Sequence, residues 1–399
     1  MVALAPLYMG VGTGTLGAIS VFLKPLVAEF GWPRGNTSLS YLAGMASAGM
    51  IGLLMGHLSD RFSTRRVVMG GALVMGGGFL AMAHLDSLWE FLLLSTISMG
   101  AGGAAFFTPV LANVGGWFTR NRGLAMGIAT AGQALGQGLV PYSIGLLIAG
   151  SGWRYTYTVM GIAVLVTLLP LALLIRTPPS RSKNTGYTPV SRDALGDIAS
   201  YAPSQVTLSF LSIAVIFCCI TMATPLVHVV ALASDRGLPP EGAARVLLIL
   251  MVGGFFGRIF FGRLSDRIGP MRTYMITSAW QSLTVFWFVW MSSPPSFYIM
   301  AAFFGFGFGG VMTSLVLCAQ KFARPEKIGF ATALVMMFAM FGMGLGATQG
   351  GFFFDLLGDY TISYLNATMA GGINLMVLSL MEGYILRKRD LNGLVLSPA

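Results

Sequence analysis

Charge is scarce in this sequence: Asp, Glu, Lys and Arg make up 10% of the 399 residues, against about a quarter in soluble domains. Cysteine is scarce too, and the three Cys lie inside apolar runs, so neither a disulfide framework nor a metal-ligand spacing is indicated. The sequence also lacks a long polar block and a series of short alternating strands. These absences exclude a soluble catalytic domain and an outer-membrane barrel, and we expect neither a cofactor nor a metal site.

Apolar residues dominate instead, at 55% of the chain with a mean hydropathy of +0.76. A membrane-spanning helix needs about 20 apolar residues. The first apolar run follows no basic segment and is too long for the core of a signal peptide, so we interpret it as a helix. The pattern predicts an all-α membrane protein with twelve transmembrane helices, near 3–30, 36–58, 67–85, 88–115, 123–150, 153–175, 207–233, 242–264, 273–292, 296–320, 328–354 and 360–386.

A proline-rich, polar segment divides the twelve runs into two sets of six. It extends from Arg176 to Val206 and is typical of a linker. We therefore predict an N-terminal six-helix half (1–175), a cytoplasmic linker (176–206), a C-terminal six-helix half (207–386) and a cytoplasmic tail (387–399).

The basic residues are distributed unevenly between the two sides of the membrane. Every second connection is basic and these connections hold 18 Lys and Arg, whereas the other side holds only Arg34, Arg154, Arg236 and Arg245. By the positive-inside rule, both termini and the linker are cytoplasmic, and we expect a multi-pass protein of the bacterial inner membrane. The net charge of +10 then reflects orientation, so no nucleic-acid partner is indicated.

Two segments recur at nearly the same offset. Gly56–Arg66 returns as Gly262–Arg272, and Phe118–Arg120 returns as Phe322–Arg324. Each copy lies at the same place in its six-helix half, which favours parallel repeats related by an axis along the membrane normal. Two pseudo-symmetric halves that rock against each other are typical of a transporter.

Both copies of the first repeat resemble the G-x-x-x-D-R-x-G-R-[RK] signature of the major facilitator superfamily, although Ser63 and Thr64 stand where the signature has Gly and Arg. The resemblance implies a cytoplasmic latch, in which aspartates near helix ends accept hydrogen bonds from helix amides and from basic partners. The alternative is that these charges only mark topology and cap helices. The latch residues expected on this basis are Asp60, Arg61, Arg122, Asp266 and Arg267.

Within this superfamily, Gly12–Arg34 and Gly115–Gly127 look like the corresponding segments of the monocarboxylate porter and oxalate:formate antiporter branch. The oxalate antiporter carries a lysine in helix 11, whereas residues 328–354 contain none, so a dianion is disfavoured. The animal porters carry an aspartate and a lysine where this chain has Gly254 and Gly17, so we do not expect proton coupling by that pair.

Arg258 lies about eight residues, or roughly 12 Å, from Asp266 at the inner end of its predicted helix. A guanidinium at that depth costs at least about 2.5–3.5 kcal/mol, so it should face a cavity and bind something. Its planar fork suits a carboxylate. The monocarboxylate family has a substrate-binding arginine in helix 8, and Arg258 resembles it by position. The alternative is a structural arginine, satisfied by helix carbonyls or by a half-buried acid.

Other polar residues in the predicted helices are candidates for lining the cavity. Their amide and hydroxyl groups donate hydrogen bonds to a carboxylate, although each also suits helix packing; they are Tyr142, Gln133, Asn113, Gln281 and Thr15. His228 is a candidate proton carrier or, alternatively, an interfacial or core histidine. We expect Lys24, about six residues from the outer end of its helix, to snorkel to the membrane interface.

We therefore predict a secondary active transporter, not an enzyme, that carries small organic anions such as lactate or pyruvate by alternating access. It would work by proton symport or anion exchange, as a monomer in the lipid bilayer. One alternative is a porter of neutral or drug-like apolar solutes in which Arg258 is structural. A second is a membrane sensor that binds a solute without moving it. An intramembrane enzyme lacks a metal cluster or a nucleophile–base spacing.

Overall fold

The computed structural model describes residues 4–117, 122–176, 204–323 and 328–395, and the regular elements in these ranges are helical. The helices of the N-terminal half (residues 4–173) are α1 (Leu4–Gly14), η1 (Thr15–Ala18), α2 (Ile19–Phe30), α3 (Arg34–Phe62), α4 (Thr64–Met82), α5 (Leu88–Ser95), η2 (Thr96–Gly103), α6 (Ala104–Trp117) and α7 (Arg122–Leu173). Gly152, at φ +78°, breaks α7 into the fifth and sixth predicted spans.

The C-terminal half (residues 204–395) contains α9 (Ser204–Asp235), α10 (Pro240–Ile268), α11 (Pro270–Val285), η5 (Phe286–Trp290), α12 (Pro294–Phe322), α13 (Ile328–Leu357) and α14 (Thr361–Val395). Helical segments thus occupy each of the twelve predicted runs, and the predicted fold class is confirmed. Most ends differ by a few residues from the predicted ones; for example, α9 begins three residues before the predicted 207, and α14 continues into the predicted tail.

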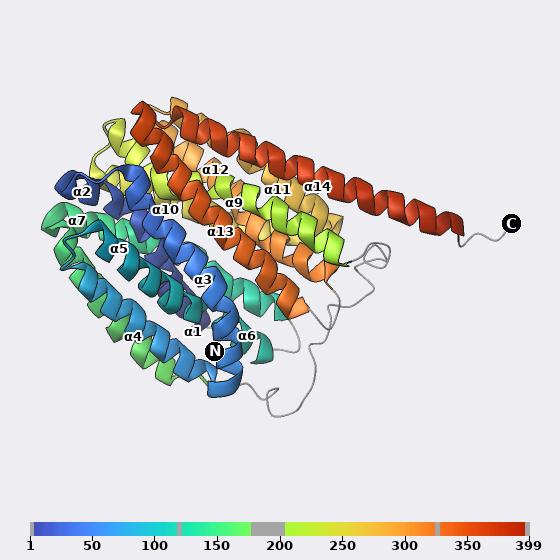
Figure 1. The fold of residues 1–399 in the computed structure, drawn as a ribbon, viewed down its shortest axis with the longest axis horizontal. Helices are drawn as coiled ribbons and strands as arrows, with labels where there is room; N and C mark the ends of the chain where they lie inside the picture. The colour runs from blue at the N-terminus through green and yellow to red at the C-terminus, as the bar shows by residue number, and fades with distance from the viewer. Residues whose placement is uncertain (1–3, 118–121, 177–203, 324–327, 396–399) are drawn as a thin grey trace.

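Eight helical stretches of the described residues are long and apolar enough to cross a membrane. α3 is not among these eight stretches of the described residues. Figure 1 shows the blue-to-green helices of the N-terminal half gathered on one side of the bundle and the yellow-to-red helices on the other. α14 extends well beyond the bundle toward the C-terminus (Figure 1). The domain boundaries remain predictions, and residues 177–203 of the linker lie outside the described residues.

Glycines set the position of α10, the helix that carries Arg258. A Cβ at Gly305 or Gly309 of α12 would overlap a backbone carbonyl of α10, and a Cβ at Gly257 would overlap the carbonyl oxygen of Phe306. The two backbones therefore lie in direct contact, as small residues allow in membrane helices. By contrast, a Cβ at Gly262 would meet nothing within 4 Å.

The second face of α10 packs antiparallel against α7 of the other half. A Cβ at Gly138 would lie 2.8 Å from the Cβ of Met251, and one at Gly145 would lie 2.9 Å from the Cβ of Ala244. The same register brings Thr130 opposite Arg258. Arg258 is thus held at the seam between the two halves, which is where a rocking transporter binds its solute.

Candidate functional site

Arg258 is half-buried, and its guanidinium reaches from α10 to α7. Nη1 donates a hydrogen bond to the backbone carbonyl of Thr130 at 2.6 Å, whereas Nε is buried without a partner. Among the residues that the structure describes, no carboxylate pairs with this guanidinium. Among the described residues its one hydrogen-bond acceptor is this neutral carbonyl, so the guanidinium has no counter-charge there.

Gln133 and Tyr142, two of the candidate lining residues, lie at different depths. Gln133 is one turn along α7 from Thr130, so it lies near the level of Arg258. Tyr142 instead interacts with the side chain of Arg245, which lies 13 residues, or about 20 Å, toward the other end of α10. The structure therefore brings Gln133 to the level of Arg258 but not Tyr142.

The other three candidate lining residues are directed into one half or the other. Asn113 donates to the backbone carbonyl of Arg176 at 3.2 Å, and Thr15 donates to the carbonyl of Gly12 and contacts Met75 of α4. Gln281 is fully buried and donates from Nε2 to the backbone oxygen of Cys218 at 3.2 Å. The donor group of each of these residues is bound inside its own half, so the structure does not bring the three residues to Arg258.

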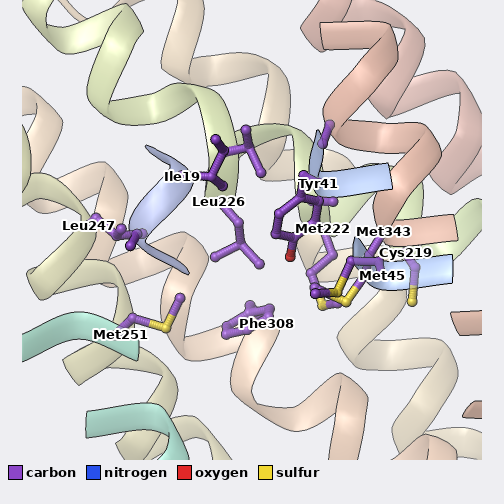
Figure 2. Packing of buried hydrophobic residues seen from close by; sticks show 14 of the residues in the cluster. Ile19, Tyr41, Met45, Cys219, Met222, Leu226, Leu247, Met251, Phe308 and Met343 are labelled. Carbon is purple, nitrogen blue, oxygen red and sulfur yellow. The ribbon is translucent and has the colours of Figure 1, made fainter. Parts of the chain in front are cut away.

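An apolar layer separates Arg258 from one end of the bundle. Met251 and Leu247 of α10 begin this layer, roughly 10 and 16 Å along the helix from Arg258. Figure 2 shows buried side chains of both halves gathered between the helices; those labelled are Ile19, Tyr41, Met45, Cys219, Met222, Leu226, Leu247, Met251, Phe308 and Met343. These side chains have no formal charge, so the layer excludes hydrated ions while it is packed.

The far side of this layer holds a group of charged residues. We call this the outer end, after the orientation predicted from charge. Asp235, at the end of α9, pairs with Lys24 at 2.8 Å and with Arg34 at 2.6 Å. Asp355, near the end of α13, accepts hydrogen bonds from the backbone amides of Arg34 and Gly35 at 2.8 and 2.6 Å. Lys24 thus has a carboxylate partner at this end, and its expected position at the membrane interface stays a prediction.

His228 is fully buried and belongs to this outer group rather than to Arg258. Its Nε2 lies 2.6 Å from the backbone oxygen of Ala347, and its Nδ1 lies 3.3 Å from the Tyr360 hydroxyl, which also accepts a 2.8 Å hydrogen bond from Arg34. The simplest assignment is that Nε2–H donates to the carbonyl and Tyr360 donates to Nδ1. His228 is then neutral and linked to Arg34 through one hydroxyl.

The predicted cytoplasmic latch lies at the opposite, inner end of the bundle. Asp266 and Arg267 are exposed at the end of α10. Asp60, Arg61 and Arg122 lie in the helices α3 and α7, but their side chains are outside the described residues. The cytoplasmic latch therefore stays a prediction.

Sequence reasoning missed Asp235, Asp355 and Tyr360. One signal was available: Arg34 is one of only four basic residues in the outer connections, and a basic residue on that side needs a reason to be there. Its partners are 201 and more residues away, at other helix ends, so the sequence alone does not pair them.

In the described residues, long apolar helices form a bundle with an arginine between its two sets of helices, as expected of a multi-pass membrane protein. A family model for the Major Facilitator Superfamily matches residues 4–347. The chain therefore belongs to the major facilitator superfamily, and it is a transporter rather than an enzyme.

Curated relatives of several kinds are similar to the chain. Monocarboxylate transporter 13 of Bos taurus is 27% identical, over 89% of this chain and 82% of the relative. MFS-type transporter 1 of Ophiocordyceps sp. is 24% identical, over 79% of this chain and 69% of the relative. The uncharacterized MFS-type transporter YhjX of Escherichia coli is 24% identical, over 84% and 82%.

Two solved structures show the same fold at low sequence identity. A crystal structure of the nucleoside transporter NupG, in a mutant form, matches with a TM-score of 0.74 and 13% identity, over 95% of this chain and 98% of the other. A bacterial homolog of the human lysosomal transporter Spinster matches with a TM-score of 0.67 and 15% identity, over 100% and 98%.

Proposed function

We propose that this transporter carries small organic anions, above all monocarboxylates, by alternating access. In this proposal Arg258 binds the carboxylate of the substrate. The observation that carries the proposal is the state of the Arg258 guanidinium at the seam between the halves. It has one neutral hydrogen-bond acceptor, a buried Nε without a partner and no carboxylate among the described residues.

An anion at this position supplies the missing charge. A carboxylate accepts two parallel hydrogen bonds from the guanidinium fork, and charge-assisted hydrogen bonds are worth roughly 1.5–3 kcal/mol each. One arginine balances one negative charge, which favours a monocarboxylate over a dianion. Gln133, one turn from Thr130, adds an amide donor at the same level, and the apolar layer beyond Met251 suits an apolar tail.

The remaining finer statements belong to the same proposal. Coupling is by proton symport or by exchange of anions, and His228, although far from Arg258, is the candidate proton carrier. Asp60, Arg61, Arg122, Asp266 and Arg267 form the cytoplasmic latch. The chain acts as a monomer in a bacterial inner membrane, with both termini in the cytoplasm and two halves joined by a linker at 176–206.

A second candidate function is transport of neutral or drug-like apolar solutes. The hydrogen bond from Arg258 to the Thr130 carbonyl favours it, because a guanidinium that ties α10 to α7 has a structural role without any substrate. The apolar layer suits such a solute as well.

Uptake of labelled lactate and pyruvate into proteoliposomes, with and without an inward proton gradient, separates the two functions. We expect Arg258→Gln to lower uptake about 100-fold, whereas substitution of Arg263, an exposed arginine on the same helix, by Gln retains it. Stimulation by the gradient indicates symport, and a requirement for internal anion indicates exchange. If no monocarboxylate is taken up and a folded Arg258→Gln protein transports apolar solutes normally, the anion proposal is wrong.

A further inference from the structure

The amino end of α3 receives its capping group from the other half of the molecule. Its N-cap residue is Pro33, which makes no side-chain cap hydrogen bond. The first backbone amides of a helix need acceptors, and carboxylates are the strongest. Asp355 of α13 supplies both oxygens, Oδ1 to the amide of Arg34 and Oδ2 to the amide of Gly35.

Asp235 makes a second link between the halves at the same place. Its two carboxylate oxygens accept hydrogen bonds from Nη1 and Nη2 of Arg34, at 2.6 and 3.2 Å. Lys24 donates to Asp235 at 2.8 Å and to the neighbouring Ser234 at 3.0 Å. Two cations of the N-terminal half thus share one acid of the C-terminal half.

The Arg34 side chain is held on all sides by residues of the C-terminal half. It is only 10% exposed. Its guanidinium carbon lies 3.7 Å from the centre of the Phe354 ring, and its Nη1 donates to the Tyr360 hydroxyl, which is in turn linked to His228. A planar arginine that is both stacked and hydrogen-bonded in this way is not replaceable by lysine.

We propose that Asp235 and Asp355 are transport residues, which act as an outer latch that closes on Arg34, Lys24 and the α3 amides and holds the outer end shut. These contacts join α2 and α3 to α9, α13 and the turn that precedes α14, so they cannot persist when the halves separate at this end. The latch therefore sets the balance between outward-closed and outward-open states. It lies on the opposite side of the apolar layer from Arg258, so its role does not depend on the identity of the substrate.

Distance measurements between spin labels on the two halves test the latch. The full chain, with its three Cys replaced by Ala, carries His84→Cys and Ser292→Cys, which are exposed positions at the outer end of each half. Reconstituted in liposomes, the parent should show mainly the short distance by pulsed electron paramagnetic resonance. We expect Asp235→Asn and Asp355→Ala to lower the ratio of closed to open populations about tenfold each.

Two further variants make the test specific. Glu29→Gln is the matched control, because Glu29 pairs with Arg154 at the same end but within one half, and it should leave the distribution unchanged. Asp355→Asn keeps an oxygen that caps α3, so it should open less than Asp355→Ala. Distributions of Asp235→Asn and both Asp355 variants that superimpose on that of the parent would overturn the proposal. If Asp355→Ala does not fold, the milder Asp355→Asn and Asp235→Asn still decide it.

Discussion

Two buried regions of positive charge lie at the seam between the halves, and they are satisfied in different ways. At the outer end, Arg34 and Lys24 meet Asp235, while Asp355 binds the amides of α3, so the protein supplies every counter-charge itself. At Arg258, the part of the chain that the structure describes supplies one neutral carbonyl. A charged group whose partners all come from the protein suits a contact that holds the molecule closed. A charged group without a protein counter-charge suits a ligand-binding site.

We expect the largest effect on transport from a substitution of Arg258, the group that we propose binds the substrate. Arg258→Gln should lower kcat/KM for monocarboxylate uptake about 100-fold, because a charge-assisted pair worth roughly 2–3 kcal/mol is lost. Its melting temperature should stay within a few degrees of the parent, since the one hydrogen bond of this side chain to the described residues is to the Thr130 carbonyl. Paired uptake and thermal-stability measurements check this. A large loss of stability with retained transport would make Arg258 structural.

A second experiment moves Arg258 without removing its charge. Gly257→Ala places a Cβ against the Phe306 carbonyl and should push α10 away from α12, with a loss of roughly 1–3 kcal/mol of stability and a fall in uptake. Gly262→Ala, on the same helix, meets open space and is the control. Thermal stability and uptake of both variants should differ clearly. Equal behaviour would mean that the α10–α12 contact does not position the site.

Exchange of the two charges of an ion pair tests the outer region alone, because Arg258 has no acidic partner among the described residues. Arg34→Asp and Asp235→Arg should each open the outer latch. The double variant should recover part of the closure, with a coupling of roughly 1–3 kcal/mol, below that of the native pair because Phe354 no longer stacks on an arginine at position 34. The spin-label distances measure it. Strictly additive effects of the two changes would show that the pair is not coupled.

The smaller effects concern the neighbours of each region. Gln133→Ala should raise KM for a monocarboxylate several-fold, because one amide donor at the level of Arg258 is lost, whereas Tyr142→Phe should not, because Tyr142 lies beside Arg245. Uptake kinetics check both. A larger effect of Tyr142→Phe would place the substrate nearer the outer end than we propose.

Tyr360→Phe should have the smallest effect. It removes the hydroxyl between Arg34 and His228 but leaves the Asp235 pairs, so it should weaken the closed outer state by roughly 1 kcal/mol, a few-fold change in the spin-label populations. No change in uptake without a proton gradient is expected. A change as large as that of Asp235→Asn would assign the main holding role to the tyrosine.

The sequence predicted the fold well because the membrane imposes long apolar runs, and because the Gly56–Arg66 repeat marks both halves. It also identified Arg258, since a charge inside an apolar run is conspicuous. The sequence did not predict the direction in which the neutral polar side chains point. A helix rotates by about 100° per residue, and the sequence pattern does not show that the side-chain nitrogens of Asn113 and Gln281 donate to backbone carbonyls within their own half.

The outer latch was beyond the reach of sequence patterns for a related reason. Its contacts join helix ends 201 to 321 residues apart, and only the packed halves bring them together. Lys24, taken alone, looks like any lysine near a membrane surface. Its role emerges only when Asp235 is placed beside it.

Direct binding of radiolabelled pyruvate to the purified protein, compared between the parent chain and Arg258→Gln, tests the central claim without any requirement for transport. The account predicts saturable binding to the parent, competition by lactate, and no detectable binding to a folded Arg258→Gln protein. Equal binding to both proteins, with unchanged competition by lactate, would contradict the assignment of Arg258 as the anion-binding group.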